Sequence, residues 1–484
     1  MSARPLPVST PAEQGVEASG IHAFLDAVES APDIEPHSLM ILRHGHVVAS
    51  GWWAPYAPER LQLLYSLSKS FTSTAAGFAA AEGLLRLDDP VISYFPEFEA
   101  DITDPRSRAM LVRHVASMAS GHLAETYDAA FRLDRAEPVR GFLLTPPDRD
   151  PGTVFTYNQP ATYTLAAIVQ RTSGLSLTEY LRPRLLDPLG IGEVAWQQHP
   201  AGRDIGFSGL HAATDAIARL GQLYLQDGVW EGRRLLPSSW IAQATGVRVA
   251  NADGTAEGAL SDWQQGYGFQ FWKSRHGYRG DGAYGQFCLV LPEHDAVIVT
   301  TAATEQMQEV LNLVWRHLLP SFGSAPLPGR EDALLGDRLA RLALEPVMAP
   351  ALPPTAGDTW AGAEFVPAGG SCAEQPSLTG ATVAAGVDGW SLSLAEGADR
   401  LDLRLDGSGW ATASDPVPMA VSGGWTAPDT LRVDVIFLET PHRLTVTCTL
   451  SDHTFTAQWH TRPLRGGRLR RLGAPREGDA VRRG

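Results

Sequence analysis

The sequence predicts an α/β domain followed by a smaller all-β domain. Two strand pairs are expected far apart in the chain, at 38–53 and at 286–301, each an apolar run folded back at a polar turn. Residues 68–245 between them are mostly helical in pattern and are interrupted by loops rich in proline and glycine. Beyond Gly357, short segments alternate apolar and polar residues. We therefore expect a sheet closed by its own two ends, and then a small barrel or sandwich.

Each element has a local signal. A short amphipathic helix is expected at 21–30, with its apolar residues on one face, and a second at 305–319. The first strand pair turns at His44–Gly45–His46, and the second turns around 292–295. A third short helix is expected at about 331–344, between two proline-rich stretches.

The composition changes along the chain divide it into four parts. Proline-rich stretches separate the first domain from the β-domain, and the last residues are basic, with eight arginines from Thr461 to Gly484. The expected parts are 1–325 as the α/β domain, 326–356 as a linker with a short helix, 357–463 as the β-domain and 464–484 as a flexible basic tail.

Composition and charge exclude several classes of protein. The chain has 484 residues, 44% hydrophobic and 19% charged, with a net charge of −15, which argues against nucleic acids and anionic membranes as partners. Cys288, Cys372 and Cys448 lie far apart, so neither a disulfide framework nor a thiolate metal site is expected. The N-terminus shows no signal peptide and no apolar run reaches membrane-spanning length, which predicts a cytoplasmic protein.

One lysine stands out. Lys69 and Lys273 are the only lysines among 39 basic residues, and Lys69 follows Ser66 by three positions at the start of an Ala-rich helical segment. Arginine keeps its proton at working pH, whereas a buried lysine can lose it and act as a base. Residues i and i+3 share a helix face, so a neutral Lys69 could activate the Ser66 hydroxyl as a nucleophile.

Ser66-Leu67-Ser68-Lys69 and four later segments together resemble the serine β-lactamase and penicillin-binding-protein superfamily. The match is nearest to its class C, esterase and D-aminopeptidase branch and covers about residues 10–322; the later segments are 111–121, 151–174, 206–237 and 280–299. The resemblance implies an antiparallel sheet flanked by helices, with a helical subdomain. It also makes a barrel- or lipocalin-like fold the expectation for the C-terminal β-domain, because some members carry such a barrel.

The resemblance implies roles for specific residues. Ser66 would be acylated, Lys69 would exchange its proton, and Tyr157 would begin the second motif, with a phenol whose pKa can be lowered beside a lysine. The family usually has asparagine two residues after the tyrosine. Here that place holds Gln159, and Asn158 stands one residue earlier, so either amide could contact the substrate.

The third motif departs from the family. Where a lysine or histidine usually starts it, the chain has Gly280, followed by Asp281 and Gly282, so the cation that helps to hold a substrate carboxylate is missing. Neutral substrates are then expected to be preferred, unless Arg279 supplies the charge. The N–H of Ala283 would complete the oxyanion hole with that of Ser66, since Gly282 lets a substrate approach the backbone.

The sequence therefore predicts a serine hydrolase that cleaves ester, amide or peptide bonds of small molecules through a Ser66 acyl-enzyme, with no cofactor and no metal. Two alternatives within the same fold stay open: a D-amino-acid-selective peptidase, and an acyltransferase or peptide-cyclising thioesterase. A third is a non-catalytic binding protein on this scaffold. The oligomeric state, the acyl group and the role of the β-domain are left open.

Overall fold

The structure, a computed structural model, describes residues 5–350, 359–386, 389–405, 407 and 409–476. Its main sheet is antiparallel with strand order β2-β1-β11-β10-β9-β8. The strands are β1 (Glu35–Arg43), β2 (His46–Trp52), β8 (Trp272–Lys273), β9 (Tyr278–Gly282), β10 (Gln286–Leu291) and β11 (Ala296–Ala303). Strand β1 pairs with β11, with Leu39 opposite Thr300, which confirms that the two expected strand pairs close one sheet.

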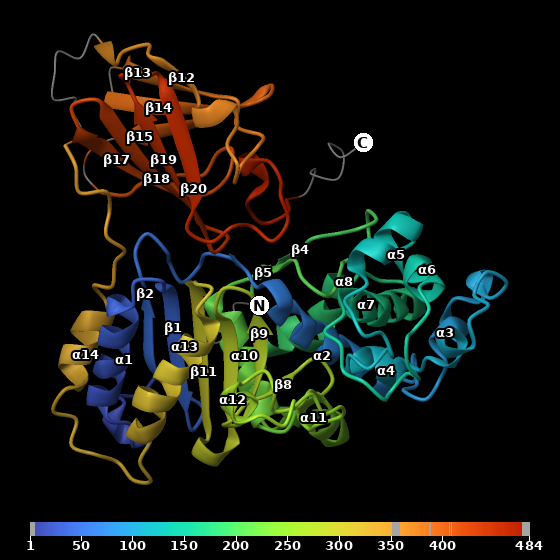
Figure 1. The fold of residues 1–484 in the computed structure, drawn as a ribbon. Coiled ribbons are helices and arrows are strands. Elements are labelled where there is room, and N and C mark those ends of the chain that lie inside the picture. Colours follow the sequence, from blue (N-terminus) through green and yellow to red (C-terminus); the bar gives the residue numbers. More distant parts are fainter. Residues whose placement is uncertain (1–4, 351–358, 387–388, 406, 408, 477–484) are drawn as a thin grey trace.

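Alternate residues of these strands pack into two separate cores. Leu39 and Ile41 belong to the core under α1 (Ala18–Ser30), α13 (Met307–Leu313) and α14 (Asp332–Leu339). Met40 and Leu42 point to the opposite core, with α2 (Ser68–Ala81) and α10 (Thr214–Leu225). Successive side chains of a strand point to opposite faces, so helices cover the sheet on both sides (Figure 1).

A helical subdomain extends beyond the β8 end of the sheet (Figure 1). Its elements are α3 (Pro105–Ala109), α4 (Val112–Ala116), α5 (Tyr127–Leu133), α6 (Pro138–Leu144), α7 (Gln159–Ser173), α8 (Leu177–Leu181) and α9 (Asp187–Leu189). Helix α7 is largely buried and packs against α2, so the start of α7 comes next to the start of α2. Further short elements are β3 (Gln62–Leu63), β4 (Ala195–Trp196), β5 (Leu210–Ala212), β6 (Val229–Trp230), β7 (Arg233–Arg234), α11 (Ser238–Thr245) and α12 (Ala256–Leu260).

The C-terminal domain is a nearly closed barrel, as expected. Its strands follow the order β15-β14-β13-β12-β20-β19-β18-β17-β16, antiparallel except between β12 and β20. They are β12 (Glu364–Pro367), β13 (Gly380–Gly386), β14 (Gly389–Glu396), β15 (Asp399–Leu405), β16 (Ala411–Ala413), β17 (Met419–Ala427), β18 (Thr430–Phe437), β19 (His442–Thr449) and β20 (Thr454–Trp459). The residues predicted to alternate do so: Leu392, Leu394, Leu401 and Leu403 are buried inside the barrel.

The barrel lies over the edge of the catalytic domain (Figure 1). Residues 464–476, the first part of the segment expected to be a flexible tail, fold back between the two domains. Leu469 is fully buried, and its N–H donates to Glu396 Oε2 at 2.8 Å. Burial of Leu469 thus anchors this segment, although the segment is basic and rich in glycine. Residues 477–484 lie outside the described residues. Within the described ranges, no helix has the length and apolar character needed to cross a membrane.

Candidate active site

Ser66 lies in a tight turn at the entrance to α2. Residues Tyr65–Leu67 form one 3₁₀ turn, and α2 begins at Ser68. The Ser68 hydroxyl donates to the Tyr65 carbonyl at 2.6 Å and accepts the N–H of Leu210 at 3.1 Å, which holds the turn in place. From 62 to 70, Ser66 is the only residue that is not buried. Its hydroxyl is therefore the group that this segment presents to the outside.

Lys69 reaches Ser66 as the spacing predicts. Its Nζ lies 3.0 Å from Ser66 Oγ, 2.6 Å from Gln159 Oε1 and 2.7 Å from the Phe207 carbonyl oxygen. The side chain is 1% exposed, and this burial lowers the pKa of Lys69 well below its ordinary value, although Glu125 and Asp281 oppose the shift. A neutral amine has two N–H groups and one lone pair. The two carbonyl oxygens accept both N–H groups, which leaves the lone pair for the Ser66 hydroxyl.

Tyr157 lies beside both Lys69 and Ser66. Lys69 Nζ is 4.7 Å from the centre of the Tyr157 ring, and that ring stacks on Trp272 with centroids 5.4 Å apart. Burial raises the pKa of Tyr157 above its ordinary value, and a side-chain hydrogen bond with Ser66 offsets only part of the rise. The lowered phenol pKa expected from the sequence is therefore corrected: Tyr157 keeps its proton and can donate it.

The structure separates the two candidate amides. Gln159 faces the site, because its Oε1 accepts from Lys69. Asn158 is fully buried, and its Oδ1 accepts both the N–H and the hydroxyl of Thr126, at 3.1 and 2.9 Å. Asn158 thus stabilises the loop before α7, and Gln159 is the amide that a substrate can meet.

Gly282 ends strand β9, and Ala283 follows it, beside the turn that contains Ser66. A Cβ on Gly282 would lie 2.1 Å from the Leu64 carbonyl oxygen, so only glycine allows this close approach. Ala283 packs with Leu63 and Tyr65, which come just before Ser66. The backbone of Ala283 is thus held beside the turn whose N–H would be the other oxyanion donor.

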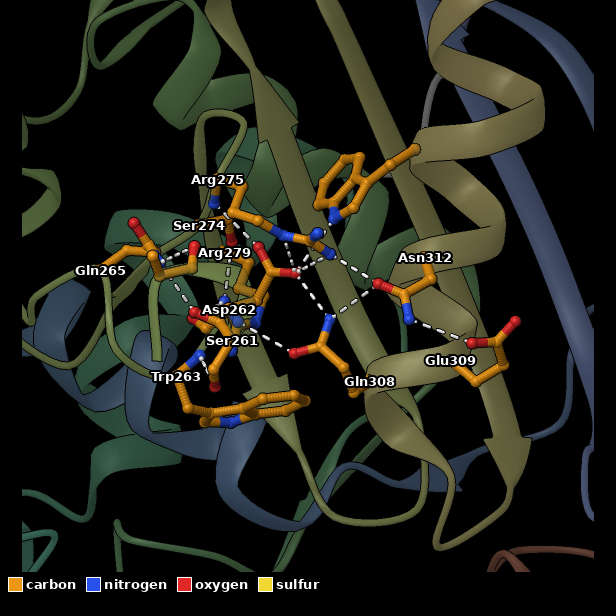
Figure 2. A network of polar contacts seen from close by, with 12 residues as sticks. Ser261, Asp262, Trp263, Gln265, Ser274, Arg275, Arg279, Gln308, Glu309 and Asn312 are labelled. Carbon is orange, nitrogen blue, oxygen red and sulfur yellow. Dashed lines mark hydrogen bonds and ion pairs between the residues drawn. The ribbon is translucent and has the colours of Figure 1, made fainter. Parts of the chain in front are cut away.

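Arg279 and Asp281 do not form a substrate anchor. Arg279 is fully buried, and its Nε donates to Asp281 Oδ2 at 2.8 Å. Its Nη1 donates to the Asp262 carbonyl at 2.8 Å and to Ser274 Oγ at 2.7 Å, within the polar network of Figure 2. These partners bind Nε and Nη1, and the whole side chain is 0% exposed, which contradicts the idea that Arg279 replaces the missing cation. Asp281, also buried, is neutralised by the same ion pair.

The site opens into a cavity of about 790 Å³ between the catalytic domain and the barrel. The described residues around it include Ser66, Glu125, Tyr127, Asp128, Gln159, Phe207, His442, Arg465, Arg468 and Arg471. The last four belong to the C-terminal domain, and nothing in the local sequence around them indicated a role in the site. Glu125 also escaped sequence analysis; its Oε1 accepts the N–H of Gln159 at 3.1 Å.

Arg465 is placed differently from its neighbours. Its guanidinium lies 4.4 Å from the centre of the Tyr127 ring and 5.1 Å from that of Phe207. Arg468 forms an ion pair with Asp399, but no carboxylate of the described chain lies within ion-pair distance of Arg465. An exposed guanidinium without an acidic partner therefore lines the cavity that Ser66 opens into.

The sheet, the helical subdomain and the serine–lysine pair at their junction define a β-lactamase-like serine hydrolase. A family model described as Beta-lactamase matches residues 26–318. The 6-aminohexanoate-dimer hydrolase of Paenarthrobacter ureafaciens is 30% identical over 321 residues, which cover 60% of this chain and 79% of that protein. The chain therefore belongs to the Beta-lactamase family.

Two further similarities extend the comparison. Lovastatin esterase of Penicillium rubens is 28% identical over 188 residues, which cover 34% of this chain and 47% of the esterase. The solved structure of EstCE1, a hydrolase with promiscuous acyltransferase activity, has a TM-score of 0.50 at 17% identity, covering 63% of this chain and 100% of that one. The second similarity shows the fold alone.

Proposed function

We propose that this protein hydrolyses amide or ester bonds of small molecules through an acyl-enzyme on Ser66. The observation that carries the proposal is the environment of Lys69, whose buried Nζ lies within 3.0 Å of Ser66 Oγ, Gln159 Oε1 and the Phe207 carbonyl oxygen, so that a neutral amine there can take the Ser66 proton. The names of two relatives, a dimer hydrolase and an esterase, also support hydrolysis. No step requires a cofactor.

The proposed reaction begins with the transfer of the Ser66 proton to Lys69. Lys69 takes the proton as Ser66 Oγ bonds to the substrate carbonyl carbon, and the N–H groups of Ser66 and Ala283 stabilise the oxyanion. Tyr157, hydrogen-bonded to Ser66, passes a proton to the leaving group and is reprotonated from Lys69. Water then attacks the ester carbonyl of the acyl-enzyme and gives its proton to Lys69. Lys69 returns this proton to Ser66 Oγ as the bond between Ser66 Oγ and the acyl carbon breaks, which releases the acid and restores the starting enzyme.

A fluorophosphonate probe tests the nucleophile directly. Intact-mass analysis is expected to show one adduct, and peptide mapping is expected to place it on Ser66. A non-catalytic binding protein with this fold would not react. The rates of hydrolysis of p-nitrophenyl esters, D- and L-aminoacyl amides and a chromogenic β-lactam would then show whether the protein is an esterase or amidase, or a D-selective peptidase.

Acyl transfer is a second candidate, because the cavity of about 790 Å³ has room for an acceptor besides the acyl group. An amine bound there would attack the same acyl-enzyme in place of water. Adding primary amines to an ester assay and analysing the products measures the share of transfer. Free acid as the only product at every amine concentration would exclude this candidate.

The pH dependence of kcat/KM tests the state of Lys69. Burial lowers the pKa of Lys69 in the folded protein, so the amine loses its proton as pH rises through that lowered value. We expect kcat/KM for a neutral ester to rise with pH along one acidic limb. Glu125 raises the pKa of Lys69, so Glu125→Gln should move the limb to lower pH.

Asp128→Asn is the matched control for that experiment. Asp128 lines the same cavity but does not contribute to the pKa shift of Lys69, so the limb should stay where it is. A profile in which activity falls as pH rises through this region would show that the protonated lysine is the active form.

Arg465 changes the expected preference for substrate charge. The sequence predicted a preference for neutral substrates because the third motif lacks its cation, but Arg465 brings a cation to the cavity from the other domain. We expect a substrate with a free carboxylate to react about tenfold better than its neutral analogue, which is the effect of about 1.4 kcal/mol. Arg465→Gln should remove this preference. Because Arg465 also lowers the pKa of Lys69, the two substrates are compared at a pH above the acidic limb of kcat/KM.

Arg468→Gln is the control, because Arg468 lines the same cavity but already pairs with Asp399. It should keep most of the preference for carboxylates. If wild type favours the neutral substrate, the sequence-based expectation holds and Arg465 does not bind substrate.

A further inference from the structure

Two tyrosines flank the two backbone N–H groups of the oxyanion hole. Tyr65 precedes Ser66, and Tyr284 follows Ala283. Both adopt left-handed backbone conformations, with φ of 48° at Tyr65 and 69° at Tyr284. This region is unfavourable for bulky residues, so such a conformation persists only where the surroundings hold it.

The C-terminal domain supplies the contacts that hold them. The Tyr65 hydroxyl lies 2.6 Å from Nε2 of His442, the first residue of β19. The Tyr284 hydroxyl donates to the backbone carbonyl of Arg462, just after β20. The two phenol rings meet edge-on with centroids 5.5 Å apart, and each also meets the His442 ring edge-on, at 5.9 and 5.4 Å.

His442 is oriented to accept from Tyr65. Its Nδ1 lies 2.8 Å from the Thr461 carbonyl oxygen, so Nδ1 carries the proton and Nε2 has the lone pair. Burial lowers the pKa of His442 to about 4, which keeps the ring neutral near pH 7. Tyr65, Tyr284 and His442 are all buried, and removing a hydroxyl there leaves a buried group without its partner.

The strand that leads into the nucleophile turn is attached to the same domain. The Leu63 N–H donates to the Glu439 carbonyl at 2.9 Å, and Gln62 Nε2 donates to the Leu438 carbonyl at 2.6 Å. Residues 62–65 are thus tied to the C-terminal domain by both backbone and side chains, immediately before Ser66.

We propose that the C-terminal barrel is part of the catalytic apparatus: through Tyr65 and Tyr284 it sets the direction of the N–H groups of Ser66 and Ala283. His442 and the Arg462 carbonyl hold the two phenols, and the phenols hold the two strained backbone positions. Tyr65, Tyr284 and His442 are positioning residues. The inference rests on the proposed acyl-enzyme at Ser66 and gives the β-domain a role in the reaction.

The test uses Tyr65→Phe and Tyr284→Phe in the full-length chain. Each keeps the ring and removes only the hydroxyl. We expect kcat for an ester to fall about 10- to 100-fold with little change in KM, because the oxyanion forms only in the transition state. The second readout is the ratio of kcat for the ester to kcat for its thionoester. Sulfur is a weak hydrogen-bond acceptor, so a misdirected oxyanion hole lowers this ratio.

Tyr56→Phe is the matched control. Tyr56 is a buried tyrosine whose hydroxyl donates across the same domain boundary, to the Thr440 carbonyl at 3.4 Å, but it does not adjoin an oxyanion donor. It should lower thermal stability by a similar amount and leave kcat and the ester-to-thionoester ratio unchanged. Thermal unfolding of all variants verifies that each is folded under assay conditions.

The kinetic results of the three variants decide whether the two tyrosines position the oxyanion donors. A lower ratio in Tyr65→Phe, Tyr284→Phe or both, with Tyr56→Phe unaffected, supports the proposal. Wild-type kcat and ratio in both variants, or an equal loss for ester and thionoester, overturns it. If wild type carries no probe adduct on Ser66, the proposed function fails first, and the positioning role fails with it.

Discussion

Ser66→Ala is expected to lower kcat by about 10⁴-fold or more, because the acyl-enzyme has no oxygen to form on. The fluorophosphonate adduct should disappear at the same time. The fold should persist, since the Ser66 hydroxyl contacts Lys69 while the turn itself is held by Ser68. Steady-state kinetics on an ester, intact-mass analysis and thermal unfolding measure the three effects.

Ser70→Ala is the control for this variant. Ser70 is buried one position after Lys69, and its hydroxyl donates to the Gln270 carbonyl at 3.1 Å, away from the cavity. It should cost about 1 kcal/mol of stability and leave the adduct in place. An adduct on Ser68 or Ser70 in wild type would show that Ser66 is not the nucleophile.

Lys69→Arg is expected to lose about 10³-fold or more in kcat, as much as Lys69→Ala. Arginine keeps the positive charge, but its pKa above about 12 prevents it from taking the Ser66 proton. Only a proton-transfer role makes the two substitutions equally damaging. The measurement is kcat for a neutral ester in wild type and both variants, with thermal unfolding for each.

Two further variants make this result interpretable. Lys69→Met keeps the length of the side chain without a charge, which avoids burying a guanidinium, and it should be as inactive as Lys69→Arg. Lys273→Arg changes the other lysine, which lies 5.7 Å from the Tyr278 ring centre, and should leave kcat unchanged. Near-wild-type turnover in Lys69→Arg would mean that the lysine is structural.

Local patterns were sufficient for the parts of the protein that short-range geometry decides. Ser66 and Lys69 are three residues apart at the start of a helix, and this spacing alone brings their side chains to 3.0 Å. The alternation along 392–403 likewise decides which residues face the barrel core, because the side-chain period of a strand is two. Such features need no knowledge of distant residues.

The choice between the two amides required the tertiary structure. Asn158 and Gln159 are adjacent and chemically similar, and the sequence left both possible. In the structure, Thr126 binds Asn158 inside the helical subdomain, while Lys69 binds Gln159. Asn158 and Gln159 differ by one position at the start of α7, and their side chains therefore point in different directions. The packing of α7 against α2 decides where the helix starts, and so which of the two amides faces the site.

The sequence also could not show which arginine lines the cavity or that the C-terminal domain lies against Ser66. Arg279, adjacent to the third motif, forms a buried ion pair with Asp281. Arg465, from the segment predicted to be a flexible tail, lines the cavity instead. Tyr65 and His442 are 377 positions apart in the chain and meet through one hydrogen bond. Periodicity and motif spacing describe residues within a few turns or strands of one another. Contacts across that separation exist only once the two domains have packed, so only the tertiary structure could show that the barrel borders Ser66.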